Sequence, residues 1–181
     1  MVSVDGLGEL HVGSPVPAEP DALALLQYDA THCSDQGLGT GPGTPGAGAW
    51  LPTYPDGPST LGTLQPFDVG PSDTHDSAIA LVEVWSPAIH TATGIHVGST
   101  VAQLHAAYGS ALSVNHAANS DVYVLHGAHS ELLFETANHD ASDPTNWTPV
   151  QVDTVVWMRV VALTETQLHI ANTDGVGPCL V

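Results

Sequence analysis

Two periods of apolar residues alternate along the chain. A spacing of three to four residues, typical of one face of a helix, occurs over 18–28 and 101–108. The second stretch also has terminal signals, because Ser99 or Thr100 can cap its start and Gly109 can end it. Runs rich in β-branched and aromatic residues follow each helix and predict strands over 61–64, 77–85, 111–116, 121–126, 130–136 and 152–163.

One segment of the sequence is repeated, and the repeat divides the predicted elements into two groups. The segment from Leu10 to Val16 recurs as Ile95 to Val101, an offset of about 85 residues, and each copy precedes a predicted helix. We therefore expect two halves, residues 1–90 with a Gly/Pro-rich surface loop over 37–58, and residues 91–181. The repeated order predicts an α+β fold of two tandem helix-plus-antiparallel-meander halves, with the helices on one face of the sheet.

The net charge of the chain excludes some classes of binding partner. The 181 residues are 43% hydrophobic, enough for a buried core, but 19 acidic residues face a single Lys or Arg, which gives a net charge of −18. Nucleic acids and anionic membrane surfaces are bound through basic side chains, so both are excluded as partners. Cationic partners, metal ions and neutral glycans stay open.

Cys33 and Cys179 are the two cysteines of the chain. We expect them to form one disulfide, with two buried thiols or part of a metal site as the alternatives, and their separation rules out a CxxC motif. A disulfide would tie the C-terminus to the first half and stabilise the fold by up to about 4–5 kcal/mol. It would also indicate an oxidising compartment, so we expect a secreted or extracytoplasmic protein, with a lipid anchor on the full-length chain left open. No run approaches the ~20 apolar residues of a membrane span.

The best candidate metal site is a predicted hairpin. If Gly127 and Ala128 form a two-residue turn, His126 and His129 lie opposite each other with Cβ atoms about 5 Å apart. Glu131 then shares a sheet face with His129 and can supply a third ligand to a divalent metal. The alternative is ordinary exposed histidines beside a turn.

A second set of candidates is aromatic. Trp85, Tyr123, Trp147 and Trp157 can line a sheet face that binds a ligand, although large aromatic residues on strands more often form core. Arg159, as the single strong cation, either pairs with a carboxylate or anchors an anionic group, and the structural ion pair is favoured.

Strong enzyme motifs are absent from the sequence. There is no GxSxG elbow, HExxH helix, Walker loop or dinucleotide fingerprint. We therefore expect no catalytic activity and no cofactor apart from the metal alternative.

Several short motifs, in their order along the chain, resemble a family of actinobacterial secreted proteins and lipoproteins. The matching pieces are Asp5-Gly6-Leu7-Gly8, Val84-Trp85-Ser86-Pro87, Gly94-Ile95-His96-Val97-Gly98-Ser99-Thr100, Ala107-Tyr108-Gly109, Leu133-Phe134-Glu135-Thr136 and Gly177-Pro178-Cys179. The repeated unit is more distantly similar to β-lactamase inhibitory proteins and to small outer-membrane assembly lipoproteins. The resemblance implies a helical layer on an antiparallel sheet and a binding role, while the nearer family has no settled activity.

The chain departs from that family in its cations. Positions where relatives tend to carry Arg or Lys hold other residues here, including His90, His96 and His105. The leading hypothesis is a secreted, non-catalytic binding protein for a protein or cell-envelope ligand. The alternatives are a His-dependent metal-binding protein and an extracellular structural or assembly subunit.

Overall fold

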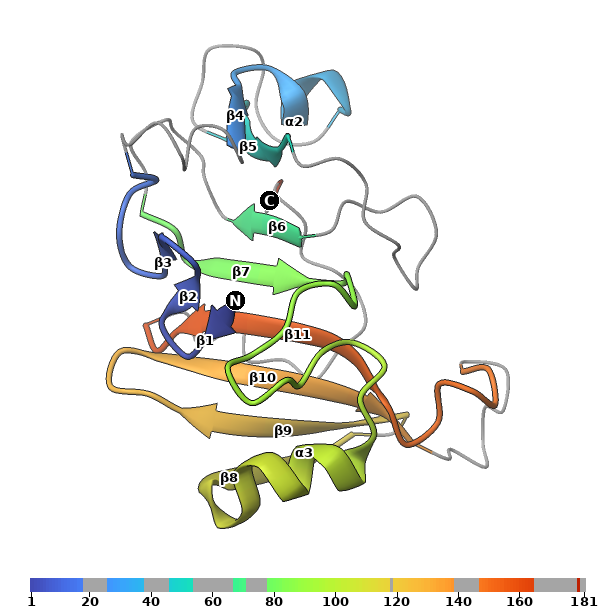
Figure 1. Ribbon diagram of the computed structural model, residues 1–181. Helices are drawn as coiled ribbons and strands as arrows, with labels where there is room; N and C mark the ends of the chain where they lie inside the picture. Colours follow the sequence, from blue (N-terminus) through green and yellow to red (C-terminus); the bar gives the residue numbers. More distant parts are fainter. Residues whose placement is uncertain are drawn as a thin grey trace.

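The computed structural model describes residues 1–17, 26–37, 46–53, 67–70, 78–117, 119–138, 147–164 and 179. Its largest element is a six-stranded antiparallel sheet with the order β6-β7-β11-β10-β9-β8 (Figure 1). The strands of this sheet are β6 (Phe67–Gly70), β7 (Leu81–Val84), β8 (Leu112–His116), β9 (Ser120–His126), β10 (Ser130–Ala137) and β11 (Val155–Ala162).

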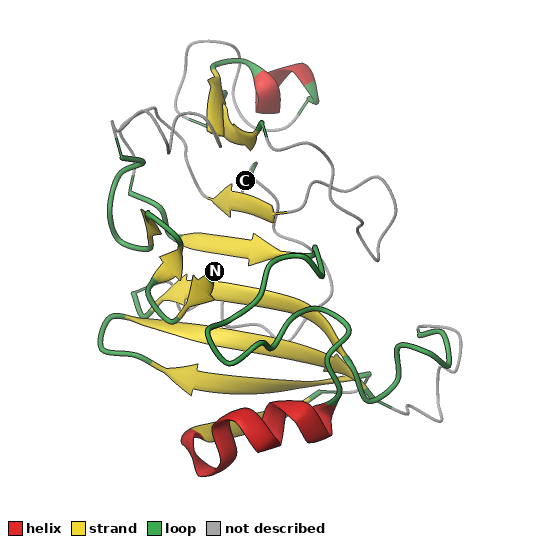
Figure 2. Ribbon diagram, viewed as in Figure 1, coloured by secondary structure: helices red, strands yellow, loops and turns green. Residues whose placement is uncertain are grey.

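Two smaller sheets and two short α-helices complete the described part of the chain (Figure 2). One sheet joins β1 (Val2–Ser3), β2 (Gly6–Leu7) and β3 (Leu10–His11). The other pairs β4 (Leu26–Asp29) with β5 (Ala49–Pro52). The helices are α2 (His32–Asp35) and α3 (Val101–Tyr108), and a 3₁₀ turn, η1 (Gly109–Ala111), follows α3.

The predicted fold class is wrong. The described residues form a mostly β structure around one large antiparallel sheet, rather than an α+β fold of two helix-plus-meander halves with the helices on one face. The two helices described span four and eight residues, too little to form a helical layer.

The error lies mainly in the first half. The end of the predicted helix over 18–28 is strand β4, and residues 18–25 lie outside the described part. Trp50, expected on a surface loop over 37–58, is buried in β5, where its ring lies 5.3 Å from that of Tyr28 across the pair. Long-range pairing with an aromatic partner has overridden local helix propensity here.

The predicted second helix is confirmed. Thr100 forms a capping box with Gln103: the Gln103 backbone N–H donates to Thr100 Oγ1 at 3.2 Å, and the Thr100 N–H donates to Gln103 Oε1 at 2.8 Å. Leu104 is fully buried, and Gly109 ends the helix with a φ of 52°. The strands predicted over 111–116, 121–126, 130–136 and 152–163 are also present as β8 to β11, with small changes at their ends.

The two echoed segments have the same turn. The Ser14 N–H donates to the His11 carbonyl at 3.1 Å, and the equivalent bond from Ser99 to His96 is 2.9 Å. The glycine inside each turn has a positive φ, 88° at Gly13 and 96° at Gly98, a conformation that strains residues with a Cβ.

Each turn also forms a backbone hydrogen bond at or just before the start of an interior strand. The Gly13 N–H donates to Ile79 O at 2.7 Å, ahead of β7, and the Gly98 N–H donates to Val155 O at 2.7 Å, at the start of β11. Because β7 and β11 are neighbours, both turns attach to the middle of the sheet. The division into residues 1–90 and 91–181 stays a prediction.

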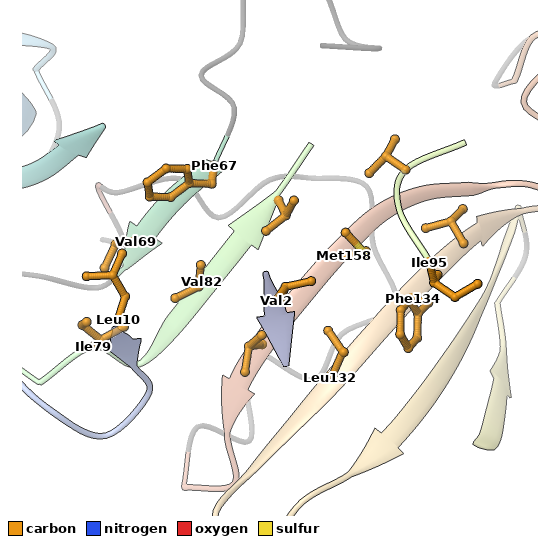
Figure 3. Close-up of a cluster of buried hydrophobic side chains, with 14 of the residues drawn as sticks. Val2, Leu10, Phe67, Val69, Ile79, Val82, Ile95, Leu132, Phe134 and Met158 are labelled. Atoms are coloured by element: carbon orange, nitrogen blue, oxygen red, sulfur yellow. The ribbon is translucent and has the colours of Figure 1, made fainter. Parts of the chain in front are cut away.

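One face of the sheet carries the main apolar core. Val82, Phe134 and Met158 project from three neighbouring strands, and Leu10 and Ile95 pack against this face from the N-terminal segment and the 85–100 loop (Figure 3). Leu104 of α3 belongs to the same cluster. This core holds the strands in register, so the residues on the opposite face keep fixed neighbours.

The predicted disulfide is confirmed. Cys33 and Cys179 are bonded, with Cα atoms 5.5 Å apart and a sequence separation of 146. Cys33 lies in α2 and is buried. The bond therefore joins the C-terminal end of the chain to the β4–α2–β5 region.

We expect loss of this disulfide to destabilise the fold. Replacing both cysteines, Cys33→Ala with Cys179→Ala, should lower the free energy of unfolding by up to about 4–5 kcal/mol, because the unfolded chain regains the entropy of a long open loop. Urea unfolding followed by tryptophan fluorescence measures this loss. Dithiothreitol should reproduce it in the wild type and have no effect on the double variant; a wild type indifferent to reductant contradicts the prediction.

Candidate functional site

The second face of the sheet carries charged residues in cross-strand rows. Residues that pair directly across antiparallel strands share a face, and the register sets out two adjacent rows. One row runs through Asp68, Glu83, Arg159, Leu133, Val124 and Ser113. The other runs through Gly70, Leu81, Val161, Glu131 and His126.

Arg159, the single Lys or Arg of the chain, is buried in the first row. Its Nε and Nη2 both reach Glu83 Oε1, at 2.6 and 2.5 Å. Glu83 itself is 0% exposed. A buried charge needs a partner to offset its desolvation, and each of these two residues supplies the other's.

One tryptophan contacts the guanidinium, and two others lie in the same cluster as that tryptophan. The Arg159 guanidinium carbon lies 5.4 Å from the centre of the Trp157 ring, a cation–π contact. The ring of Trp85 lies 5.3 Å from that of Trp157. Trp147 packs against the cluster that contains both, and its Nε1 donates to the Asn119 carbonyl at 2.5 Å. The structural ion pair expected for Arg159 is therefore present, and Trp85 and Trp157 are buried.

The structure separates Tyr123 from these tryptophans. Its side chain lies on the other face of the sheet, within the main core, in an edge-to-face contact with the ring of His105 at 5.2 Å. Burial, with smaller contributions from the charges of Asp121 and Asp153, raises the pKa of Tyr123 above its usual value. The five predicted ligand-binding residues thus do not form one surface.

Asp68 is the third ionisable group of the first row. Burial, and then the neighbouring charge of Glu83, raise the pKa of Asp68 from 3.8 to about 7. Arg159 already neutralises Glu83, so an ionised Asp68 would leave one uncompensated negative charge inside the sheet.

The predicted metal site does not form. Gly127 N–H donates to Ser130 O at 2.9 Å, so the hairpin turn consists of Ala128 and His129, one position later than expected. This shift places His126 opposite Glu131 instead of opposite His129. Within the described ranges, no three His, Cys, Asp or Glu side chains are grouped as metal ligands.

The shifted hairpin and the pairing of β8 with β9 together form a hydrogen-bonded chain of three side chains. His126 Nδ1 lies 2.7 Å from Glu131 Oε1, and His126 Nε2 lies 2.9 Å from Ser113 Oγ. Ser113 is the member that sequence reasoning missed. No short sequence motif marks Ser113 as part of this group. Finding it requires the pairing register of three strands, β8, β9 and β10.

A shallow hollow of about 340 Å³ lies at this chain of side chains. Its lining combines Ser113, His126 and Glu131 with one amide and four apolar residues, namely Asn115, Val122, Val124, Leu133 and Leu163. The hollow therefore joins polar groups to apolar walls, a composition typical of small-ligand sites.

Comparison with known proteins adds little to this geometry. No protein-family model matches the chain, and no curated protein matches it. Among solved structures, the chain is similar to the uncharacterized protein yfeY from Escherichia coli, at 17% identity and a TM-score of 0.46, over 89% of this chain and 98% of that one. The resemblance to the actinobacterial family stays a prediction.

None of the helices in the described ranges is long and apolar enough to span a bilayer. The disulfide is typical of proteins outside the reducing cytoplasm.

Asp68 leads to a pH prediction. Because its folded pKa is raised, the folded protein binds this proton more tightly than the unfolded chain does, so stability from this group is greatest in acid. It should fall by about 1.4 kcal/mol for each pH unit between about 4 and about 7. Asp68→Asn should therefore stabilise the protein at pH 8 and have little effect at pH 4.

Thermal unfolding of both proteins across that range measures the difference. Asp5→Asn, which removes the same charge from an exposed turn, is the matched control and should not show the growing stabilisation. If the two aspartate variants behave alike at every pH, burial of Asp68 does not govern its titration.

Proposed function

We propose that the protein is a secreted binding protein that recognises a basic, extended segment of another protein in the cell envelope or its surroundings. The observation that carries this proposal is the burial of the only strong cation, Arg159, in a pair with Glu83. With that cation internal, the acidic residues outside are not balanced by any exposed Lys or Arg.

The electrostatics favour a cationic partner. A net charge of −18 produces a negative potential that attracts basic segments and repels acidic ones. The raised pKa of Tyr123, caused in part by Asp121 and Asp153, is consistent with a negative field at β9. Asp121 pairs with His116 of β8, and Glu131 lies one strand farther from that edge, on β10.

The edge strand β8 supports an extended binding mode. It is the last strand in the sheet order, and Ser113, Val114, Asn115 and His116 are all exposed. The Ala117 N–H donates to Ser120 O, and hydrogen-bonded pairs alternate with non-hydrogen-bonded pairs along antiparallel strands. The backbone N–H and C=O groups of Ser113 and Asn115 therefore point toward β9, whereas those of Val114 point away from it. An edge of this kind can pair with an added strand.

Self-association through the same edge is the competing use. Two copies would bring together two chains of charge −18, which opposes pairing at low ionic strength. A basic segment has the opposite sign and gains from the same field. Charge thus favours a foreign strand over a second copy, and the assembly-subunit alternative becomes an outcome of the test.

The test uses a defined peptide. We expect Ac-KVKVKVK-NH₂ to bind and its Glu counterpart Ac-EVEVEVE-NH₂ not to bind in isothermal titration calorimetry, with affinity falling between about 50 and about 300 mM NaCl. Val114→Pro removes one outward N–H without touching the β8–β9 bonds, and it should weaken binding about fivefold or more. Val114→Ala, which keeps that N–H, is the matched control.

Three outcomes contradict the proposal: no binding of the Lys peptide, equal binding of both peptides, or equal affinities for Val114→Pro and Val114→Ala. Circular dichroism of each variant confirms that the sheet is retained. A dimer in multi-angle light scattering that disappears in Val114→Pro assigns the edge to self-association instead.

A further inference from the structure

The Ser113–His126–Glu131 chain has the connectivity of an activated serine. Glu131 Oε1 lies 2.7 Å from Nδ1 of His126, and Ser113 Oγ lies 2.9 Å from Nε2 of the same ring. One tautomer satisfies both contacts: Nδ1–H donates to the carboxylate, and Nε2 accepts the serine hydroxyl. This is the arrangement in which an imidazole can take a proton from a serine.

The sheet explains why these three side chains meet. His126 and Glu131 are direct cross-strand partners of β9 and β10. Ser113 pairs with Val124, two residues before His126 on the same face, so it is the diagonal neighbour of the histidine. Residues on regular strands keep such positions better than residues on loops.

The three side chains of this group differ in their exposure to solvent. The Glu131 side chain is 14% exposed, whereas that of His126 is 56% exposed and Ser113 lies at the surface. The carboxylate therefore sits at the base of the site, and the hydroxyl is accessible to a molecule from solvent. A second pair on the same sheet, His116 with Asp121 at 2.7 Å, has a similar imidazole–carboxylate contact and provides a natural control.

The hollow supplies the other parts that acyl transfer needs. Asn115 lies two residues after Ser113 on β8, hence on the same face, and it lines the hollow. Its amide N–H₂ is a donor of the type that stabilises a developing oxyanion. Val124, Leu133 and Leu163 provide apolar walls for a short alkyl chain.

We propose that Ser113 is a nucleophile toward small, uncharged activated esters, with His126 as its general base and Glu131 as the positioning residue. Ser113 Oγ forms a bond to the ester carbonyl carbon while its proton passes to His126 Nε2. The carbon–oxygen bond to the leaving alcohol then breaks, and His126 returns the proton to that alcohol. Water releases the acyl group as a carboxylic acid by the reverse sequence.

This inference goes beyond the proposed binding function and replaces the expectation that the protein has no catalytic activity. It also stands apart from that function in its atoms. Strand addition at β8 uses the outward backbone of Val114, whereas acyl transfer uses side chains on one face of the sheet. Either can fail without the other.

The direct test is covalent labelling with a small alkyl fluorophosphonate, in which Ser113 Oγ bonds to phosphorus and fluoride leaves. Intact-mass and peptide mass spectrometry should find one adduct, on Ser113. Ser113→Ala should abolish it, and His126→Gln should slow it about 100-fold, the usual effect of losing a general base. His116→Gln, the matched control, should leave the rate unchanged.

Hydrolysis of p-nitrophenyl butyrate gives a second readout with the same expected order of variants. For Glu131, long-range ¹H–¹⁵N spectra of His126 report which ring nitrogen carries the proton. We expect Nδ1–H in the wild type and a shift toward Nε2–H in Glu131→Ala, a change that a merely structural role does not produce. Labelling at another residue, no labelling, or equal rates for the His126→Gln and His116→Gln variants overturns the proposal.

Discussion

The buried pair between Glu83 and Arg159 is the interaction on which the rest of the structure depends. It joins β7 to β11, two neighbouring interior strands of the sheet, and it contains the only strong cation of the chain. Desolvating two charges is unfavourable, so the pair is maintained only because geometry is close and Trp157 covers the guanidinium. Beside this pair, burial and then the charge of Glu83 raise the pKa of Asp68 to about 7.

The pair has consequences for both the inside and the outside of the molecule. Inside, the opposite sheet face is apolar, with Phe134 and Met158 in its core cluster (Figure 3). Leu104 of α3 belongs to the same cluster. Glycine turns at Gly13 and Gly98 attach the covering segments to the strand entrances. Outside, acidic side chains remain without exposed Lys or Arg, which is the basis for proposing a basic ligand.

Sequence reasoning succeeded where local signals determine structure. The capping residues Thr100 and Gly109 located α3, and the β-rich composition of 111–163 located four strands. The Cys33–Cys179 bond was among the alternatives that the cysteines allowed. These features depend on backbone chemistry or on a pair of residues, so they need little knowledge of the tertiary structure.

Sequence reasoning failed where long-range contacts determine the structure. The β4–β5 pairing, which buries Trp50, has no signature in a segment rich in Gly and Pro. A shift of one residue in the hairpin at His129 replaced an expected His–His pair with His126 opposite Glu131, and the separate pairing of β8 with β9 places Ser113 within reach of His126. Moving the turn by one position moves the partner of each β9 residue by two positions along β10, so every cross-strand neighbour changes although each side chain keeps its face.

A double-mutant cycle on the central pair tests this account most directly. Glu83→Met and Arg159→Met, measured singly and together by urea unfolding, separate the pair's interaction from the effect of each side chain. We expect each single change to cost about 3–5 kcal/mol, because it leaves a buried charge without its partner, and the double change to cost clearly less than their sum. Additive losses would contradict the claim that this pair organises the sheet.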